Sequence, residues 1–395
     1  MQQSPARWLP ARLLFLLLFI HAASGTSVSW ALTPEPGGDT VRLSRISQHG
    51  ITWKLSHQVD VGRFINGDYY VVGPVTVVEI TPAFSKGRNG SMLNPDFGVE
   101  QGYDSREGET YRSQRVAKPP INLNPGDVLV STRSRTGSQR LRHVMADSLP
   151  DTEGLSYALL TSAAILTCVD APKPGRFRPP YSGPRRFFRE SALRWDRLPR
   201  LTIAGTLPDV SYWERIFERP WIDHLSRVWI NRYIHPTDNM PDYGREMSLA
   251  VSMASLILAS DISTTEKRSL LISFVQFGID TWGLATQADA DEGWESMGGH
   301  GNGRKWPMIF AGLLLDEQEI LQTRALFSED QQTSYGQGWN GASALYRWYH
   351  RSYPSSAWHY EETRPRDWST ILGEEYRRCC TSVSWPGTAL VALAM

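Results

Sequence analysis

The pattern of apolar residues changes near residue 190, and this change limits the folds that the chain can adopt. Before it, residues 69–80 are rich in β-branched and aromatic side chains, which favour strands, and a Gly-Pro turn interrupts them. Residues 128–132 and 157–169 have the same strand-like composition. Several short strands separated by turn residues are typical of β-sandwiches. We therefore expect an antiparallel β-sandwich domain over residues 45–172.

The second half has the pattern of helices. Apolar residues recur every three or four positions from Trp213 to Trp229, which gives a helix with one apolar face. Ser263 and Glu266 form a capping-box pair before another apolar-periodic stretch. Asp242 is a plausible N-cap for the helix that follows it. Further helices are expected at residues 243–259, 308–315 and 387–395.

Together these patterns predict an α+β protein of several domains. Twelve of the 15 tryptophans lie between Trp195 and Trp385, within the helical half. Buried antiparallel helices of this kind are consistent with an (α/α) toroid-like domain over residues 210–395. That domain could be incomplete at its C-terminus, because the last helix ends without a polar cap. A Pro- and Arg-rich linker, residues 173–209, is expected between the two domains.

The N-terminus has the features of a secretory signal peptide. Arg7 and Arg12 precede the apolar residues 13–20, and small residues follow at positions 22–25. The apolar run is too short to span a bilayer as a helix. We expect residues 1–25 to be removed and the mature protein to be secreted or periplasmic, without a membrane anchor. A retained anchor is the alternative.

Composition excludes some classes of partner and cofactor. The chain carries 41 basic and 41 acidic residues, whereas nucleic-acid-binding domains are usually basic, so we expect no nucleic-acid partner. Its three cysteines include no Cys-x-x-Cys pair, and no His-x-x-x-His occurs, so we expect no metal. Cys168 lies in an apolar run and is expected to be buried, with Cys379 or Cys380 as a conceivable disulfide partner.

The run at residues 298–307, Gly-Gly-His-Gly-Asn-Gly-Arg-Lys-Trp-Pro, carries the main functional signal. Proline is favoured at the first turn of a helix, so the run predicts a loop that enters a helix N-terminus, where anions bind. His300, Asn302, Arg304 and Lys305 would then surround a carboxylate. Arginine can pair with a carboxylate through two hydrogen bonds, which lysine does less precisely.

Other loops add candidate groups. Tyr243 with Arg245 precedes one predicted helix, and Tyr360 and Tyr376 also lie beside charged residues. A phenolate near an arginine is stabilised, so each tyrosine is a candidate for proton transfer. Trp294 and Trp339 could offer aromatic faces to a sugar ring. Asp291 and Glu295 are candidate carboxylates.

These residue types suit the cleavage of a uronic-acid polysaccharide by β-elimination. That reaction needs a group that neutralises the uronate carboxylate, a base that removes the neighbouring ring proton, and an acid for the leaving oxygen. His300, Asn302 and Arg304 could neutralise, and His300 or a tyrosine could transfer the protons. The scheme requires no cofactor.

The strand-rich half, the tryptophan-rich helical half and the 298–307 run together resemble secreted bacterial polysaccharide lyases of the helical-toroid type, which include alginate- and heparin-lyase-like proteins. The resemblance covers residues 200–395 in architecture and residue style. It implies an acidic polysaccharide or oligosaccharide as substrate. Two alternatives remain open: a glycoside hydrolase that uses Asp291 or Glu295, and a glycan-binding surface protein without catalytic activity.

Overall fold

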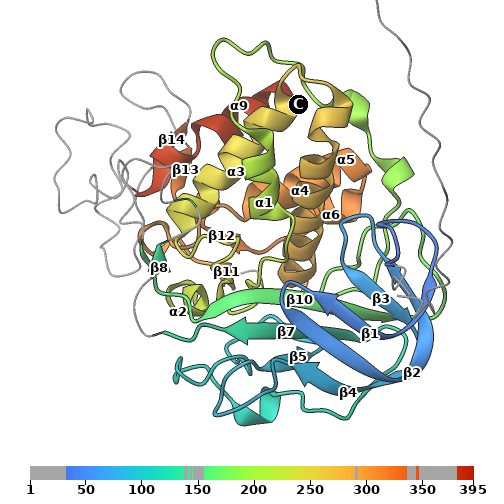
Figure 1. The fold of residues 1–395 in the computed structure, drawn as a ribbon. Coiled ribbons are helices and arrows are strands. Elements are labelled where there is room, and N and C mark those ends of the chain that lie inside the picture. Colours follow the sequence, from blue (N-terminus) through green and yellow to red (C-terminus); the bar gives the residue numbers. More distant parts are fainter. Residues whose placement is uncertain are drawn as a thin grey trace, which may run out of the picture. The chain divides into compact units, whose positions relative to one another are not determined.

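The strands of the first half form one mixed sheet that curls into a half-barrel (Figure 1). This computed structural model describes residues 33–137, 141–142, 145, 155–289, 292–335, 344–346 and 380–395. The strand order is β5-β7-β10-β3-β2-β4-β6, with β1 paired to β2. Only β10 and β3 run parallel in this sheet. Its strands are β1 (Val41–Gln48), β2 (Ile51–Arg63), β3 (Tyr69–Val72), β4 (Val75–Thr81), β5 (Ser91–Leu93), β6 (Ile121–Leu123), β7 (Val128–Ser134) and β10 (Leu160–Val169).

Both faces of the central strands are buried, but against different partners. Side chains alternate between the two faces of a strand. Along β7, Val128 and Val130 belong to the core shared with the helices, whereas Leu129 belongs to a second core within the curl of the sheet. In β10, Ile165 and Leu166 divide between the two cores in the same way. The sheet is therefore a layer between two apolar cores.

The helices group on one side of the sheet (Figure 1). Helix α4 begins at a capping box in which Ser263 and Glu266 satisfy each other's backbone N–H groups. It packs against α5, and α3 packs against the C-terminal helix α9. The α-helices are α1 (Val210–Phe217), α2 (Val228–Asn231), α3 (Gly244–Ala259), α4 (Thr264–Ala285), α5 (Lys305–Leu315), α6 (Gln318–Gln322), α7 (Ser328–Gln331) and α9 (Pro386–Ala394). Short strand pairs are β8 (Leu141–Arg142) with β9 (Leu155–Ser156), β11 (Gly293–Trp294) with β12 (Leu326–Phe327), and β13 (Thr333–Tyr335) with β14 (Ala344–Tyr346).

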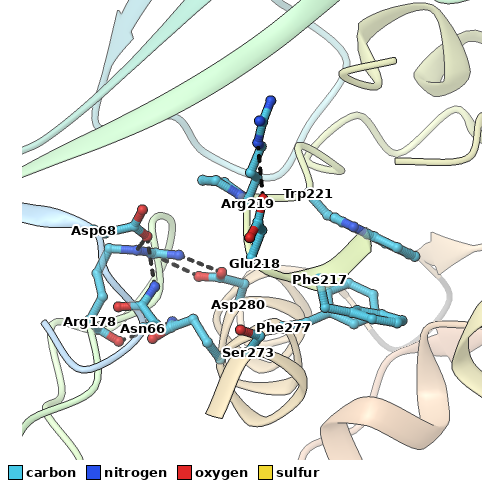
Figure 2. Close-up of a pocket in the computed structure, with 12 residues that line it drawn as sticks. Asn66, Asp68, Arg178, Phe217, Glu218, Arg219, Trp221, Ser273, Phe277 and Asp280 are labelled. Atoms are coloured by element: carbon cyan, nitrogen blue, oxygen red, sulfur yellow. Dashed lines mark hydrogen bonds and ion pairs between the residues drawn. The ribbon is translucent and has the colours of Figure 1, made fainter. Parts of the chain in front are cut away.

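A buried ion cluster joins the sheet to α4 (Figure 2). Arg178 donates through Nε to Asp68 at 2.6 Å, and through Nη1 and Nη2 to Asp280 at 2.9 and 2.6 Å. All three residues are at most 4% exposed. Burial opposes the charge of Arg178, but Asp280 and Asp68 outweigh it and raise the pKa of the guanidinium. The adjoining cavity measures about 10 Å³, which is room for about one water molecule.

The predicted fold class is wrong for both halves of the chain. The sheet is single and mixed, so it is not an antiparallel sandwich. Helices make up about a third of the described residues, and they do not form an (α/α) toroid. The strand-like composition identified strands correctly, but it does not show whether a second sheet or a helical layer covers them. The region from Pro34 to Met395 is one compact unit.

Several local predictions are confirmed. The strands on either side of the Gly-Pro turn are β3 and β4, and the capping box opens α4. Asp242 does not cap α3; it accepts a hydrogen bond from the backbone of Tyr157 at 2.6 Å. Cys168 is buried and free, and burial raises its pKa to about 12.

Two further predictions concern the expected linker and the expected signal peptide. The stretch predicted as a linker contributes the fully buried Phe177 and Tyr181 to the core. Residues 1–25 lie outside the described residues. Among the helices that are described, none combines the length and apolar character needed to cross a bilayer.

Acid should destabilise the fold through His224. This side chain is fully buried, and neither ring nitrogen has a hydrogen-bond partner among the described residues. Burial, followed by the charge of Arg115, lowers its pKa to about 4. Between that value and the unfolded pKa of about 6.5, only the unfolded chain binds the proton, so stability falls as pH falls, by up to about 1.4 kcal/mol per pH unit. Urea unfolding at several pH values should show this slope flattened in His224→Phe and unchanged in the exposed-site control His57→Phe.

Candidate functional site

The glycine-rich run forms the turn between the short helix η5 (Met297–Gly299) and α5. Gly303 adopts φ = +91°, and a Cβ atom there would lie 2.7 Å from the backbone nitrogen of Ser248 on α3. Any side chain would therefore be strained and would clash with the α3 backbone. This glycine serves close packing of the loop against α3.

Arg304 lies in the interior. Its side chain is 1% exposed, and Nε and Nη2 donate to the two carboxylate oxygens of Asp223 at 2.9 and 3.0 Å. Nη1 donates to the carbonyls of His300 and Asn302 at 2.7 and 2.8 Å. Burial alone would raise the pKa of Asp223, but Arg304 and His235 outweigh it and lower this pKa. A carboxylate of the chain itself already engages Arg304, so we assign it to support of the loop.

Asn302 and Trp294 are also interior residues. Asn302 is fully buried; Oδ1 accepts from Ser328 and Nδ2 donates to the carbonyl of Cys380 at 3.2 Å. Trp294 is fully buried and stacks on Phe327 with ring centroids 5.3 Å apart. Neither side chain presents a surface to a ligand.

The remaining predicted residues divide into those that the structure describes and those that it does not. Lys305 is partly exposed and pairs with Asp330. Glu295 is also partly exposed. Four candidates lie outside the described residues: Asp291, Trp339, Tyr360 and Tyr376.

His300 and Tyr243 lie together. Their ring centroids are 4.6 Å apart, and the Tyr243 hydroxyl donates to the carbonyl of Gly298 at 2.5 Å. Trp229, which follows the first residue of α2 and is 46% exposed, packs against His300 with centroids 4.8 Å apart. Neither ring nitrogen of His300 bonds to a described residue, and Nδ1 is shielded from solvent. The structure thus adds an exposed indole to the predicted imidazole and phenol.

Arg232 is the candidate site residue that sequence reasoning missed. Its guanidinium lies 3.8 Å from the ring centroid of Trp229, 4.1 Å from that of Tyr157 and 5.3 Å from that of Tyr233. The residue is 7% exposed, yet its side chain forms no hydrogen bond or ion pair with any described residue. The spacing of Trp229, Arg232 and Tyr233 was the available signal. We call these residues, with Tyr157, Tyr243 and His300, the Arg232 cluster.

Two buried carboxylates lie next to the cluster. Asp242 accepts from the backbone of Tyr157, as described above. Glu246 is 3% exposed; its Oε1 accepts from Nε and Nη2 of Arg245 at 3.1 and 2.6 Å, while Oε2 has no partner among the described residues. Burial raises the pKa of Glu246, and the negative charge of Asp242 adds to the rise. Arg245 also lies 5.5 Å from the ring of Tyr243.

Burial and the positive charges around His300 favour the neutral imidazole. Burial, followed by the positive charges of Arg232, Arg304 and His235, lowers its pKa to about 3. An anion bound to Arg232 would offset one of these charges and raise the pKa again. The basicity of His300 is therefore coupled to the occupancy of Arg232.

Among the described residues, no group of three or more His, Cys, Asp or Glu side chains could hold a metal ion. The residues of the Arg232 cluster can bind an anion, stack against a ring and transfer a proton. No protein-family model, curated protein or solved structure matches this chain.

Proposed function

We propose that the Arg232 cluster binds the carboxylate of a uronic-acid sugar and that the protein cleaves acidic polysaccharides by β-elimination. The observation that carries this proposal is Arg232, which is 7% exposed and whose guanidinium forms no ion pair with any described residue. Arginine stays charged in proteins, and a buried charge is costly without a counter-charge. A planar carboxylate that accepts two hydrogen bonds would supply it.

The rings around Arg232 favour a sugar as the carrier of that carboxylate. They contact the guanidinium through their faces, at 3.8 and 4.1 Å for Trp229 and Tyr157. This cation–π contact holds the guanidinium in place without using its N–H donors. The exposed part of Trp229 then offers an apolar face to the C–H groups of a pyranose ring.

The proposed chemistry follows from these positions. Arg232 neutralises the uronate carboxylate, which acidifies the proton on C5 and stabilises the enolate-like transition state. His300 takes that proton as the C4–O4 bond breaks and a C4–C5 double bond forms, and Tyr243 supplies a proton to the leaving oxygen. A proton returns from His300 to Tyr243 through solvent after product release. The predicted carboxylate clamp thus moves from Arg304 to Arg232.

Export remains part of the proposal, because the pattern of residues 1–25 is that of a signal peptide. A secreted or periplasmic location would give the enzyme access to extracellular polysaccharide.

A glycoside hydrolase is the second candidate, and a specific observation favours it. Glu246 has a raised pKa and one oxygen without a partner among the described residues, while Asp242 lies close enough to influence it. Two carboxylates in different environments are the usual equipment of a glycosidase. The products distinguish the two candidates, because only elimination leaves an unsaturated uronate.

Digestion of a panel of acidic polysaccharides should release products that absorb in the ultraviolet as unsaturated uronates. Arg232→Gln should lower kcat/KM on the responsive substrate by about 10- to 100-fold, since a hydrogen bond to a charged group is worth about 1.5–3 kcal/mol. Esterifying the substrate carboxylates should remove most of the difference between variant and parent.

The matched control is Arg227→Gln, five residues earlier and 59% exposed at the side chain, which should leave the rate unchanged. New reducing ends without the chromophore would reject the lyase and favour the hydrolase. An equal loss on free and esterified substrate would reject Arg232 as the carboxylate ligand.

A further inference from the structure

A second candidate site involves another part of the same loop. A cavity of about 320 Å³ is lined by Gly303, Lys305 and Trp306, and by residues of α3, α7 and α9. His300 and Tyr243 do not line it. Its volume lies at the lower end of the range for small-molecule sites. It therefore suits one small ligand and is separate from the Arg232 cluster.

One polar group in the wall has unused hydrogen-bonding capacity. Glu329 accepts from the backbone N–H of Gly303 at 2.7 Å, whereas its other carboxyl oxygen, Oε2, is shielded from solvent without a partner among the described residues. The other polar wall residues have partners: Thr388 bonds to Ser252 at 2.9 Å, and Lys305 pairs with Asp330. A turn of the side chain would bring Oε2 into the cavity, where a ligand that supplies a hydrogen-bond donor would satisfy it.

The rest of the wall is apolar and can be reached from solvent. Trp306 and Trp385 are each less than 10% exposed and contribute indole rings, and Val251 is almost fully buried. Ala389 and Ala392 of α9 line the cavity and are exposed, so the cavity opens on that side. A ligand with an apolar face would pack against the indoles and the alanines.

The charges at the polar end favour a neutral ligand. Burial raises the pKa of Glu329 although Lys305 and Arg304 act in the opposite direction. Those two cations disfavour an organic cation beside Glu329, and Asp330 disfavours an anion beside Lys305. What remains is an uncharged molecule that carries hydroxyl donors on an otherwise apolar framework.

We infer that this cavity binds a single neutral sugar ring, with a hydroxyl donated to Glu329 and C–H faces against the indoles. The site is independent of the proposed lyase chemistry, because no residue of the Arg232 cluster contributes to it. An exported protein that binds a neutral sugar here would recognise the neutral residues of a polysaccharide that contains both uronic acids and neutral sugars.

The test is binding of methyl glycosides of glucose, galactose, mannose and N-acetylglucosamine, measured by saturation-transfer NMR and tryptophan fluorescence on the full chain. At least one should bind saturably. Ala392→Trp, which places an indole at the opening, should weaken that binding by about tenfold or more, the factor that 1.4 kcal/mol produces. Ala394→Trp is the matched control: it is exposed on the same helix, does not line the cavity, and should leave binding unchanged.

Three outcomes would overturn the inference. They are no saturable binding of any of the four glycosides at about 10 mM, tighter binding of glucosamine or glucuronate than of the neutral sugars, and equal effects of the two tryptophan variants. Arg232→Gln should not alter neutral-sugar binding. A failure of the proposed lyase activity and a failure of neutral-sugar binding can therefore be told apart.

Discussion

Replacing Arg178 with methionine should lower the free energy of unfolding by about 3–5 kcal/mol, the usual result of removing one partner from a buried ion pair. The variant leaves the carboxylates of Asp68 and Asp280, 1% and 4% exposed, without their cation. It also removes the ionic contact through Arg178 between Asp68, just before β3, and Asp280 of α4. Urea unfolding followed by circular dichroism at neutral pH measures the change.

Arg194→Met is the control for this variant, because Arg194 pairs with Asp196 and Asp316 at the surface. Exposed ion pairs contribute about 0–1 kcal/mol. If Arg178→Met does not fold, Arg178→Lys replaces it in the test. Lysine keeps the positive charge but loses the planar double contact, so we expect an intermediate loss of stability. Similar small losses in Arg178→Met and Arg194→Met would show that the cluster does not brace the fold.

His300→Ala should lower kcat on the responsive acidic polysaccharide by about 10²–10⁴-fold, the range for a positioned acid or base. KM should change far less, because the proposed carboxylate ligand is Arg232. The imidazole packs between Trp229 and Tyr243 at 4.8 and 4.6 Å and has no hydrogen bond to a described residue. The rate of appearance of the unsaturated product measures kcat, and the melting temperature reports the fold.

His57→Ala, at an exposed position on β2, should leave kcat unchanged. An activity of His300→Ala within about threefold of the parent, with the fold intact, would remove His300 from the proposed mechanism. A rise in KM with unchanged kcat would make His300 a binding residue instead.

Part of the local structure could be predicted from the sequence, and the topology could not. The turn between β3 and β4 and the capping box of α4 depend on neighbouring residues, so they are visible in short windows. The place of β10 between β7 and β3 depends on pairing with residues about 30 and 100 positions away. Composition indicated the strand β7, but not which element covers each of its faces.

The candidate site was predicted in part, for a similar reason. Glycines around His300 indicated a loop, and the structure has one. The same run made Arg304 look like an available cation. Its partner, Asp223, lies 81 residues earlier in the chain, so the run itself does not reveal the ion pair. Arg232 lies in a short helical stretch with an ordinary sequence pattern. Its significance comes from the lack of an ion-pair partner among the described residues, which only coordinates reveal.

The sandwiched sheet has a consequence for how such a protein can diversify. On β7 and β10, nearly every position is buried on one side or the other, so a substitution there alters packing whichever way its side chain points. Substitutions that keep the fold are easier at exposed positions of the connecting segments than on these two strands. New specificities in descendants of this chain should therefore arise through exchanges around Trp229 and Tyr157, while the central strands drift slowly.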